Sequence, residues 1–255
     1  MLENLFGLKN KTALITGSSQ GIGLTLTRGL ACAGAHVILN GRNHEKLDKA
    51  INALKANGYK ISGCPFDVTN ENDVSEAISL INKDIGDIDI LINNAGTTIR
   101  APLEFYPLSD WRKILDTNLT SAFLVSRAVV KSMIKNKAGK IINICSIQSD
   151  LGRPTIAAYA ASKGGLKMLT KNMATEWGKH NIQVNGLAPG YFETELTKPL
   201  IEDEEFNAWL CNRTPAGRWG DPEELVGAAV FLASKASDYV NGHILFVDGG
   251  LMACV

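Results

Sequence analysis

The chain has 255 residues, of which 45% are apolar and 20% charged, a composition typical of a globular protein with an ordinary core. Its 26 basic residues balance its 26 acidic ones, which argues against binding to nucleic acid or to an anionic membrane surface. The first residues lack the basic and apolar stretches of a secretory leader, and no apolar run reaches about 18 residues, so we expect neither export nor membrane insertion.

The cysteines and histidines show no metal or disulfide pattern. Five cysteines lie far apart, without C-x-x-C spacing, which argues against a disulfide framework or a zinc site and favours a reducing cytoplasm. Four histidines lack H-x-x-H and H-E-x-x-H spacing. We therefore expect no catalytic metal, and a structural cation stays open.

Short apolar runs bounded by glycine or polar turns alternate with amphipathic stretches. The runs are too short for helices and have the continuous apolar character of strands covered on both faces. One amphipathic stretch places Leu26, Gly29, Leu30 and Ala33 on a single helix face. The alternation predicts an α/β fold, a single-domain Rossmann-type doubly wound parallel sheet of about seven strands with helices on both faces. The apolar runs lie at 12–16, 36–39, 88–92, 140–145, 182–187 and 244–247.

Three segments predict where later helices begin. Ser109, before Asp110, offers a capping oxygen. Asp221 and Pro222, followed by two glutamates, supply a cap, a first-turn proline and acids at the positive end of a helix dipole. The acidic run 202–205 is interpreted as a solvated loop or a helix start.

A glycine-rich turn follows the first predicted strand and precedes the first amphipathic helix. In this position Gly17 would make the tight turn, Gly21 would let the backbone approach a pyrophosphate, and Gly23 would allow close helix packing. The alternative is a purely structural turn. The segment predicts a dinucleotide site with the residues Gly17, Ser18, Ser19, Gln20, Gly21, Ile22 and Gly23.

The tip of the second predicted strand indicates the cofactor. NAD-binding versions of this fold carry an acid there, whereas this chain has Asn40, Gly41 and Arg42. Arg42 can pair with a 2′-phosphate, aided by Ser18 or Ser19, so NADP(H) is preferred and NAD(H) stays possible. Alternatively, Arg42 is a solvated loop residue.

Tyr159, Lys163 and Ser146 form the candidate catalytic group. Four-residue spacing puts Tyr159 and Lys163 on one helix face. A free phenol has a pKa near 10, and an ammonium together with a nicotinamide cation can lower it. Ser146 follows the 140–145 strand, at the sheet edge where ligands bind, although it can also simply cap a turn.

Together these residues resemble the short-chain dehydrogenase/reductase family over nearly the whole chain. The resemblance implies one domain, residues 1–255, with a substrate-loop insertion around 191–217. Tyr159 would be the general acid, Ser146 would polarise the reacting oxygen, and Lys163 would bind the nicotinamide ribose. Asn118 would support a water in the proton relay. The further cofactor contacts that the resemblance implies are Asp67, Val68, Asn94, Ala95, Gly96, Pro189, Gly190, Phe192 and Thr194.

Segments 143–153, 188–195 and 209–222 are more closely similar to family members that act on sugar acids. Some of those members carry aspartate near the second-strand tip, and its absence here supports NADP. A pocket for a sugar acid needs a cation for the carboxylate, and donors and acceptors that stay hydrogen-bonded to the hydroxyls when water leaves. The candidates are Arg100, Gln148 and Arg153, together with Ser146 and Tyr159, although each of the first three can also be a surface residue.

Two other functions stay open on the sequence. One is a reductase of the same fold that acts on a 3-oxoacyl thioester or another polyol, and the other is a non-catalytic dinucleotide sensor. The resemblance also implies a homotetramer, in which the apolar C-terminal strand and residues 251–255 are buried.

Overall fold

The computed structural model describes residues 1–254, so Val255 of the predicted C-terminal contact lies outside the described residues. Seven parallel strands form one sheet in the order β3-β2-β1-β4-β5-β6-β7. This order confirms the predicted doubly wound fold, and the chain reverses direction across the sheet between β1 and β4. The strands are β1 (Thr12–Ile15), β2 (His36–Leu39), β3 (Ile61–Gly63), β4 (Ile90–Asn93), β5 (Gly139–Ile144), β6 (Ile182–Pro189) and β7 (Ile244–Val247).

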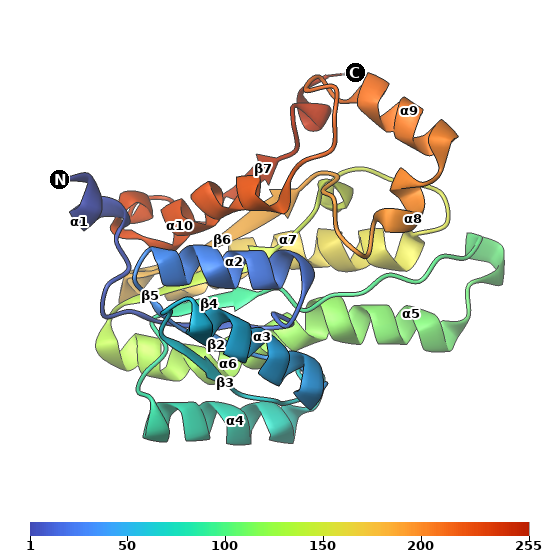
Figure 1. The fold of residues 1–255 in the computed structure, drawn as a ribbon. Coiled ribbons are helices and arrows are strands. Elements are labelled where there is room, and N and C mark those ends of the chain that lie inside the picture. The colour runs from blue at the N-terminus through green and yellow to red at the C-terminus, as the bar shows by residue number, and fades with distance from the viewer. Residues whose placement is uncertain (255) are drawn as a thin grey trace.

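Helices cover both faces of the sheet (Figure 1). One core cluster packs α2, α3 and α10 against it, and a second packs α4, α6 and α7 on the other side. No helix in residues 1–254 is long and apolar enough to cross a membrane. The helices are α1 (Leu2–Phe6), α2 (Gly21–Cys32), α3 (His44–Ala56), α4 (Glu71–Asp84), α5 (Leu108–Leu115), α6 (Ser121–Asn136), α7 (Ala157–Trp177), α8 (Lys198–Ile201), α9 (Glu204–Arg213) and α10 (Val226–Ala233).

The predicted elements differ from the observed ones in a few places. The six apolar runs are strands with ends shifted by at most two residues, but β3 was not predicted because it is only three residues long and half-exposed. The cap predicted at Ser109 is wrong, because α5 begins at Leu108 with Pro107 in the cap position and no side-chain cap bond. Asp221 is the predicted cap and also forms a capping box with Glu224, and Asp203 of the acidic run caps α9.

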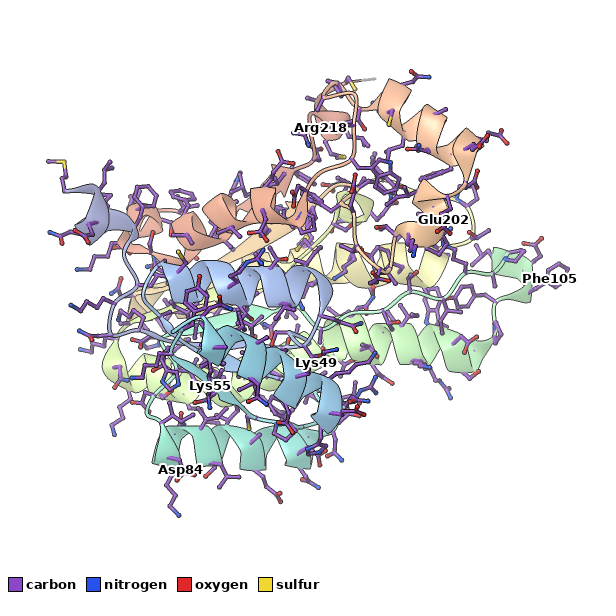
Figure 2. All side chains as sticks on the ribbon, in the orientation of Figure 1. Lys49, Lys55, Asp84, Phe105, Glu202 and Arg218 are labelled. Carbon is purple, nitrogen blue, oxygen red and sulfur yellow. The ribbon has the colours of Figure 1, made fainter. Side chains whose placement is uncertain are left out.

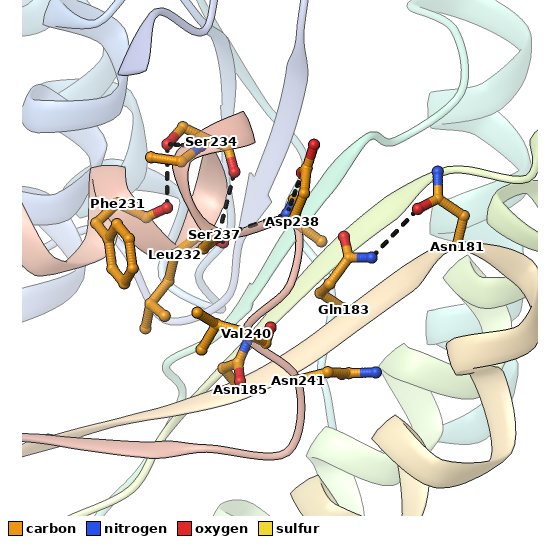
Figure 3. A network of polar contacts seen from close by, with 12 residues as sticks. Asn181, Gln183, Asn185, Phe231, Leu232, Ser234, Ser237, Asp238, Val240 and Asn241 are labelled. Carbon is orange, nitrogen blue, oxygen red and sulfur yellow. Dashed lines mark hydrogen bonds and ion pairs between the residues drawn. The ribbon is translucent and has the colours of Figure 1, made fainter. Parts of the chain in front are cut away.

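A polar network connects the amino-terminal half of β6 to the segment between α10 and β7, at the end of the sheet away from the strands' carboxyl ends (Figure 3). Asn185 of β6 donates to the Val240 carbonyl at 2.8 Å, and the Ser237 hydroxyl donates to the Leu232 carbonyl at 3.1 Å. These bonds satisfy buried polar groups where the chain turns from α10 into β7. The opposite edge is left to loops that converge from β1, β4, β5 and β6.

Candidate active site

The glycine turn between β1 and α2 is built around close backbone contacts. Gly17 has φ +60°, and a side chain there would come within 2.9 Å of the Ala95 Cα. A side chain at Gly23 would lie 2.4 Å from Asn94 Nδ2. Gly21 also has positive φ, but no atom lies within 4 Å of its missing Cβ. The backbone at Gly21, where α2 begins, is therefore open to approach, which fits a phosphate-bearing cofactor at the helix N-terminus.

The two serines of this turn differ in what their hydroxyls do. The fully buried Ser18 hydroxyl donates to the Ile15 carbonyl at 2.7 Å and accepts from the Asn40 amide at 3.0 Å. The interpretation of Ser18 as a hydroxyl partner for a 2′-phosphate is thus corrected, since its bonds are used within the protein. Ser19 is half-buried beside Gly41, while Gln20 is exposed and Ile22 half-buried at the start of α2.

Asn40 replaces the acid of NAD-binding versions with a structural side chain. Its Oδ1 accepts from the Gly17 amide at 3.2 Å, and its Nδ2 donates to the carbonyls of Cys64 and Phe66. These bonds tie the glycine turn to the segment after β3. Asn40 leaves no carboxylate at the tip of β2 to repel a phosphate.

Arg42 lies exposed at the same tip, 3.6 Å from the Asp67 carboxylate. Partial burial raises the pKa of Asp67, but hydrogen bonds from Thr69 and the charge of Arg42 outweigh it and hold the pKa below its ordinary value. Two of the predicted cofactor residues, Arg42 and Asp67, therefore lie side by side. Val68, which follows Asp67 and was also predicted to contact the cofactor, is buried against α4.

The segment after β4 is held to both neighbouring elements. Asn94 donates to the Thr16 and Gly17 carbonyls, each at 2.9 Å. The buried Asn118 accepts from the Thr97 amide at 2.8 Å and donates to the Ser162 hydroxyl at 3.0 Å. It lies in a π-helical turn between α5 and α6, a distortion that is frequent at functional sites. Gly96 thereby lies beside the Lys163 ammonium, and Ala95 lies against Gly17.

Ser146 and Tyr159 face the same space beyond β5. Ser146 caps the short turn Ile147–Ser149, and its hydroxyl accepts from the Gln148 amide at 3.1 Å. Burial raises the pKa of the Tyr159 phenol, and hydrogen bonding with the Ser146 side chain opposes that rise. Tyr159 therefore keeps its proton at neutral pH in the absence of a cofactor.

Lys163 is buried one helical turn beyond Tyr159. Its Nζ lies 5.7 Å from the centre of the Tyr159 ring and donates to the Ile144 carbonyl at 2.6 Å. Burial lowers the pKa of Lys163 to about 8, because no carboxylate offsets the loss of solvation. The predicted lowering of the Tyr159 pKa by Lys163 is not seen without the cofactor, where burial dominates.

The predicted nicotinamide-side residues lie at and after the end of β6. Pro189 is the last residue of β6, and a side chain at Gly190 would lie 2.8 Å from the Asp248 backbone. The Phe192 carbonyl accepts from the Thr197 hydroxyl at 2.6 Å, which also bonds the Thr194 amide at 2.9 Å. These bonds close a compact turn before α8.

The three predicted substrate residues reach the same region from two loops. The amide side chain of Gln148 is about nine-tenths buried, and its Oε1 has no hydrogen-bond partner. Burial and the charge of Arg153 lower the pKa of Arg100. The loops of the two arginines lie side by side, since the Ala101 amide donates to the Thr155 carbonyl at 3.0 Å. Two cationic side chains and an unpaired buried acceptor are chemistry suited to a hydroxylated anion.

Sequence reasoning missed Tyr191 and Phe206. The Tyr191 hydroxyl accepts from Arg153 Nη1 at 3.2 Å, and the Arg153 guanidinium lies 4.2 Å from the Phe206 ring centre. The two aromatics lie 15 positions apart, one before α8 and the other in α9, so no periodicity of a single helix links them. The only sequence signal is the concentration of aromatic residues between 191 and 219.

The chain is similar over its full length to known dehydrogenases and reductases. The profile of the short chain dehydrogenase family matches residues 11–205. The chain is 55% identical over 254 residues to the 5-keto-D-gluconate 5-reductase of Escherichia coli K12, with 100% of both chains covered. It is 57% identical over 248 residues to the gluconate 5-dehydrogenase of Gluconobacter oxydans, with 97% of each covered. A gluconate 5-dehydrogenase structure from Burkholderia cenocepacia in complex with NADP and tartrate is 52% identical, with a TM-score of 0.98 and 100% coverage of both chains.

Proposed function

Since this chain belongs to the short chain dehydrogenase family, we propose that it interconverts D-gluconate and 5-keto-D-gluconate with NADP(H). Full-length similarity to two gluconate enzymes is the observation that carries the substrate. The crystallised relative binds NADP and tartrate, a hydroxy acid, which supports the same class of ligand. The 340 nm assay described below tests this proposal.

Tyr159 is proposed as the general acid of carbonyl reduction. NADPH supplies the hydride when bound. The proton goes from the Tyr159 hydroxyl to the reacting oxygen, which Ser146 holds and polarises. The raised pKa of Tyr159 supports this direction, because a protonated phenol is available at neutral pH. For oxidation, the nearby positive charges must lower that pKa.

Lys163 and Asn118 are proposed to support the proton transfer. Lys163 would bind the hydroxyls of the nicotinamide ribose with its ammonium, which already lies beside Tyr159 and Gly96. Asn118 would hold a water of the relay from the π-helical turn. The remaining proposed cofactor contacts are those of the glycine turn, Asp67, Val68, the segment 94–96, Pro189, Gly190, Phe192 and Thr194.

Arg42 is proposed to select NADPH. It is exposed at the tip of β2, where a 2′-phosphate would replace its weak pairing with Asp67. Asn40 supports the choice because its neutral side chain is committed to the backbone. NADH would lack the phosphate that Arg42 pairs with.

Arg100, Gln148 and Arg153 are proposed to bind the sugar acid. The arginines would pair with its carboxylate, and the unpaired Gln148 Oε1 would accept from one of its hydroxyls. This set favours hydroxy acids over thioesters, whose chains offer few groups to pair with these residues.

We also propose one domain with a substrate segment around 191–217, a cytoplasmic location and a homotetramer built from two-fold contacts. The edge strand β7 supports the assembly, because its residues after Ile244 are only half-buried in one chain.

A 340 nm assay tests the function directly. Purified protein is given NADPH or NADH with a panel of keto sugar acids, including 5-keto-D-gluconate, and with an acetoacetyl thioester. We expect reduction of 5-keto-D-gluconate with NADPH at a kcat/KM at least about tenfold above the other pairs. Preference for the thioester would replace the proposal with the fatty-acyl alternative, and no turnover of any carbonyl compound would favour a dinucleotide sensor.

A further inference from the structure

Arg153 is held by two aromatic residues that belong to a different part of the chain. It follows β5, whereas Tyr191 follows β6 and Phe206 lies in α9. The Tyr191 hydroxyl accepts one hydrogen bond from Arg153, and the Phe206 ring stacks against its guanidinium at 4.2 Å. The other donors of Arg153 bond to no side chain or backbone group within residues 1–254. They are left to bind a ligand.

Arg100 and Arg153 lie on two loops that are joined by a backbone hydrogen bond, and neither side chain has a counter-ion. Neither forms an ion pair with a carboxylate in the part of the chain that the structure describes. The charge of Arg153 disfavours the charged form of Arg100, and a bound anion would oppose that effect. A planar guanidinium binds a carboxylate through two parallel hydrogen bonds, which makes a carboxylate the fitting anion.

The backbone keeps the two arginines in place. The Ala101 amide donates to the Thr155 carbonyl at 3.0 Å and so joins the loop of Arg100 to that of Arg153. Thr155 has φ +70°, an unfavourable conformation for a β-branched residue. Such strain persists only where surrounding contacts enforce it, and the hydrogen bond from Ala101 to Thr155 is such a contact in the loop that carries Arg153.

The aromatic residues are themselves held rigidly. The Tyr191 ring packs edge-on against Phe206 and against Trp219, each with centroids 5.6 Å apart. The Trp219 indole donates to Asn207 Oδ1 of α9 at 2.7 Å. Tyr191 precedes α8 and Trp219 follows α9, so their contact joins both ends of this helical segment. Glu202 marks the junction of α8 and α9 in Figure 2.

We propose that Tyr191 and Phe206 are positioning residues that orient Arg153 toward the carboxylate of a sugar acid, and that this contact selects acids over neutral sugars. The proposal rests on the proposed function and deepens it. Tyr191 and Phe206 act through Arg153, since neither supplies the positive charge that the carboxylate needs. The 198–213 helical segment thereby takes part in substrate selection through the Phe206 ring, and the positive charge comes from Arg153.

Selectivity between an acid and its neutral counterpart provides the kinetic test. L-Sorbose has the carbon chain of 5-keto-D-gluconate with a hydroxymethyl group in place of the carboxylate. With NADPH saturating, we expect Tyr191→Phe and Phe206→Leu to lower the ratio of kcat/KM for 5-keto-D-gluconate to that for L-sorbose by about tenfold. The loss should appear in the KM for the acid, with kcat changed by less than about threefold.

Two matched variants serve as controls. Phe206→Tyr keeps an aromatic face under Arg153 and should restore the ratio. Trp209 packs against the Phe206 ring with centroids 5.3 Å apart, and no cation–π contact joins it to Arg153 among the described residues. Trp209→Leu should therefore leave the ratio unchanged. Equal losses for both substrates, or an equal effect of Trp209→Leu, would overturn the proposal.

A binding measurement separates this proposal from the proposed function. In the presence of NADPH, D-gluconate cannot be oxidised, so calorimetry can compare its binding with that of sorbitol. We expect wild-type protein to bind D-gluconate more tightly, and the two variants to lose about tenfold of that affinity while sorbitol binding is unchanged. If this result holds but 5-keto-D-gluconate is not reduced, the proposed reaction alone fails. If D-gluconate and sorbitol bind equally, the positioning proposal fails.

Discussion

Lys163 shows how burial opposes charge in a single functional side chain. The residue is 3% exposed and its Nζ lies 2.6 Å from a carbonyl oxygen, yet no carboxylate balances its charge within the described residues. The pKa lowered to about 8 measures the resulting cost. Lys163 thus lowers the free energy of unfolding of the free protein, and its burial places a cation beside Tyr159.

Replacing Lys163 by methionine should stabilise the free protein at pH 7 while it abolishes turnover. Below about pH 8 the lysine is charged in both folded and unfolded states, so its burial cost, up to about 3 kcal/mol, is present in full. As pH rises toward 10.5, the folded lysine loses its proton first and the cost disappears. Thermal unfolding at pH 7 and pH 10 should show a gain that shrinks at the higher pH, and a gain independent of pH would contradict this account.

Tyr159→Phe should reduce turnover by at least about 100-fold, because the ring remains but no proton can be donated. The dissociation constant for NADPH, measured by fluorescence titration, should change by less than about threefold. Tyr239→Phe, at a fully exposed tyrosine, is the matched control and should behave as wild type. Near-normal rates in Tyr159→Phe would refute the assigned mechanism.

Arg42→Ala should raise the KM for NADPH by about tenfold or more and leave the KM for NADH within about twofold. Only NADPH brings a phosphate whose pairing is lost. Arg28→Ala, which removes an exposed arginine from α2 that pairs with Glu223, serves as the control. Initial rates at varied cofactor would show a similar change for both cofactors if Arg42 is only a solvated loop residue.

At the scale of elements, the junction between the glycine turn and α2 depends on the lack of side chains. Gly23 faces Asn94 Nδ2, and Asn94 is bonded to both Thr16 and Gly17. The turn, the start of α2 and the segment after β4 therefore form one rigid unit. Any added atom at Gly23 must displace the segment that carries Gly96.

Gly23→Ala should lower the melting temperature and raise the KM for NADPH by about tenfold, because the new methyl group would lie 2.4 Å from Asn94 Nδ2. Gly227→Ala is the control in a helix with open space around the missing Cβ. That substitution should stabilise the protein by up to about 1 kcal/mol, since alanine favours helix more than glycine does. Unchanged stability and cofactor binding in Gly23→Ala would show that the junction is not tightly packed.

At the scale of the whole molecule, the strand order brings distant residues together. The carboxyl ends of β1, β4, β5 and β6 meet at one edge, which explains how residues from 17 to 194 reach one site. The excursion before α5 carries the exposed Phe105 to the outer tip of the molecule, as Figure 2 shows. At the end of the sheet, β7 is half-buried after Ile244.

The proposed tetramer should appear as a single species of four chains in sedimentation velocity, at concentrations used for assays. The physical reason is that a half-buried edge strand has unpaired backbone groups which another copy can cover. A species of one chain at all concentrations, with full activity, would exclude the assembly as a requirement for function.

The sequence by itself determined the fold class, because continuous apolar runs and helical periodicity are local properties of the chain. It also identified Gly17, Gly23, Ser146 and the Tyr159–Lys163 spacing as a candidate site, since their positions relative to strands and helices are legible from order alone. The short strand β3 was not predicted, because its three residues include only one buried apolar side chain and form no apolar run.

Tertiary structure alone decided how the polar groups are used. The Ser18 hydroxyl and the Asn40 amide turned inward to backbone partners, whereas Arg42 stayed exposed. Tyr191 and Phe206 met Arg153 only through folding, because no local pattern links a loop after β5 to helix α9. Periodicity reports which face is buried, but hydrogen bonds and burial of charge depend on which distant atoms arrive beside a group.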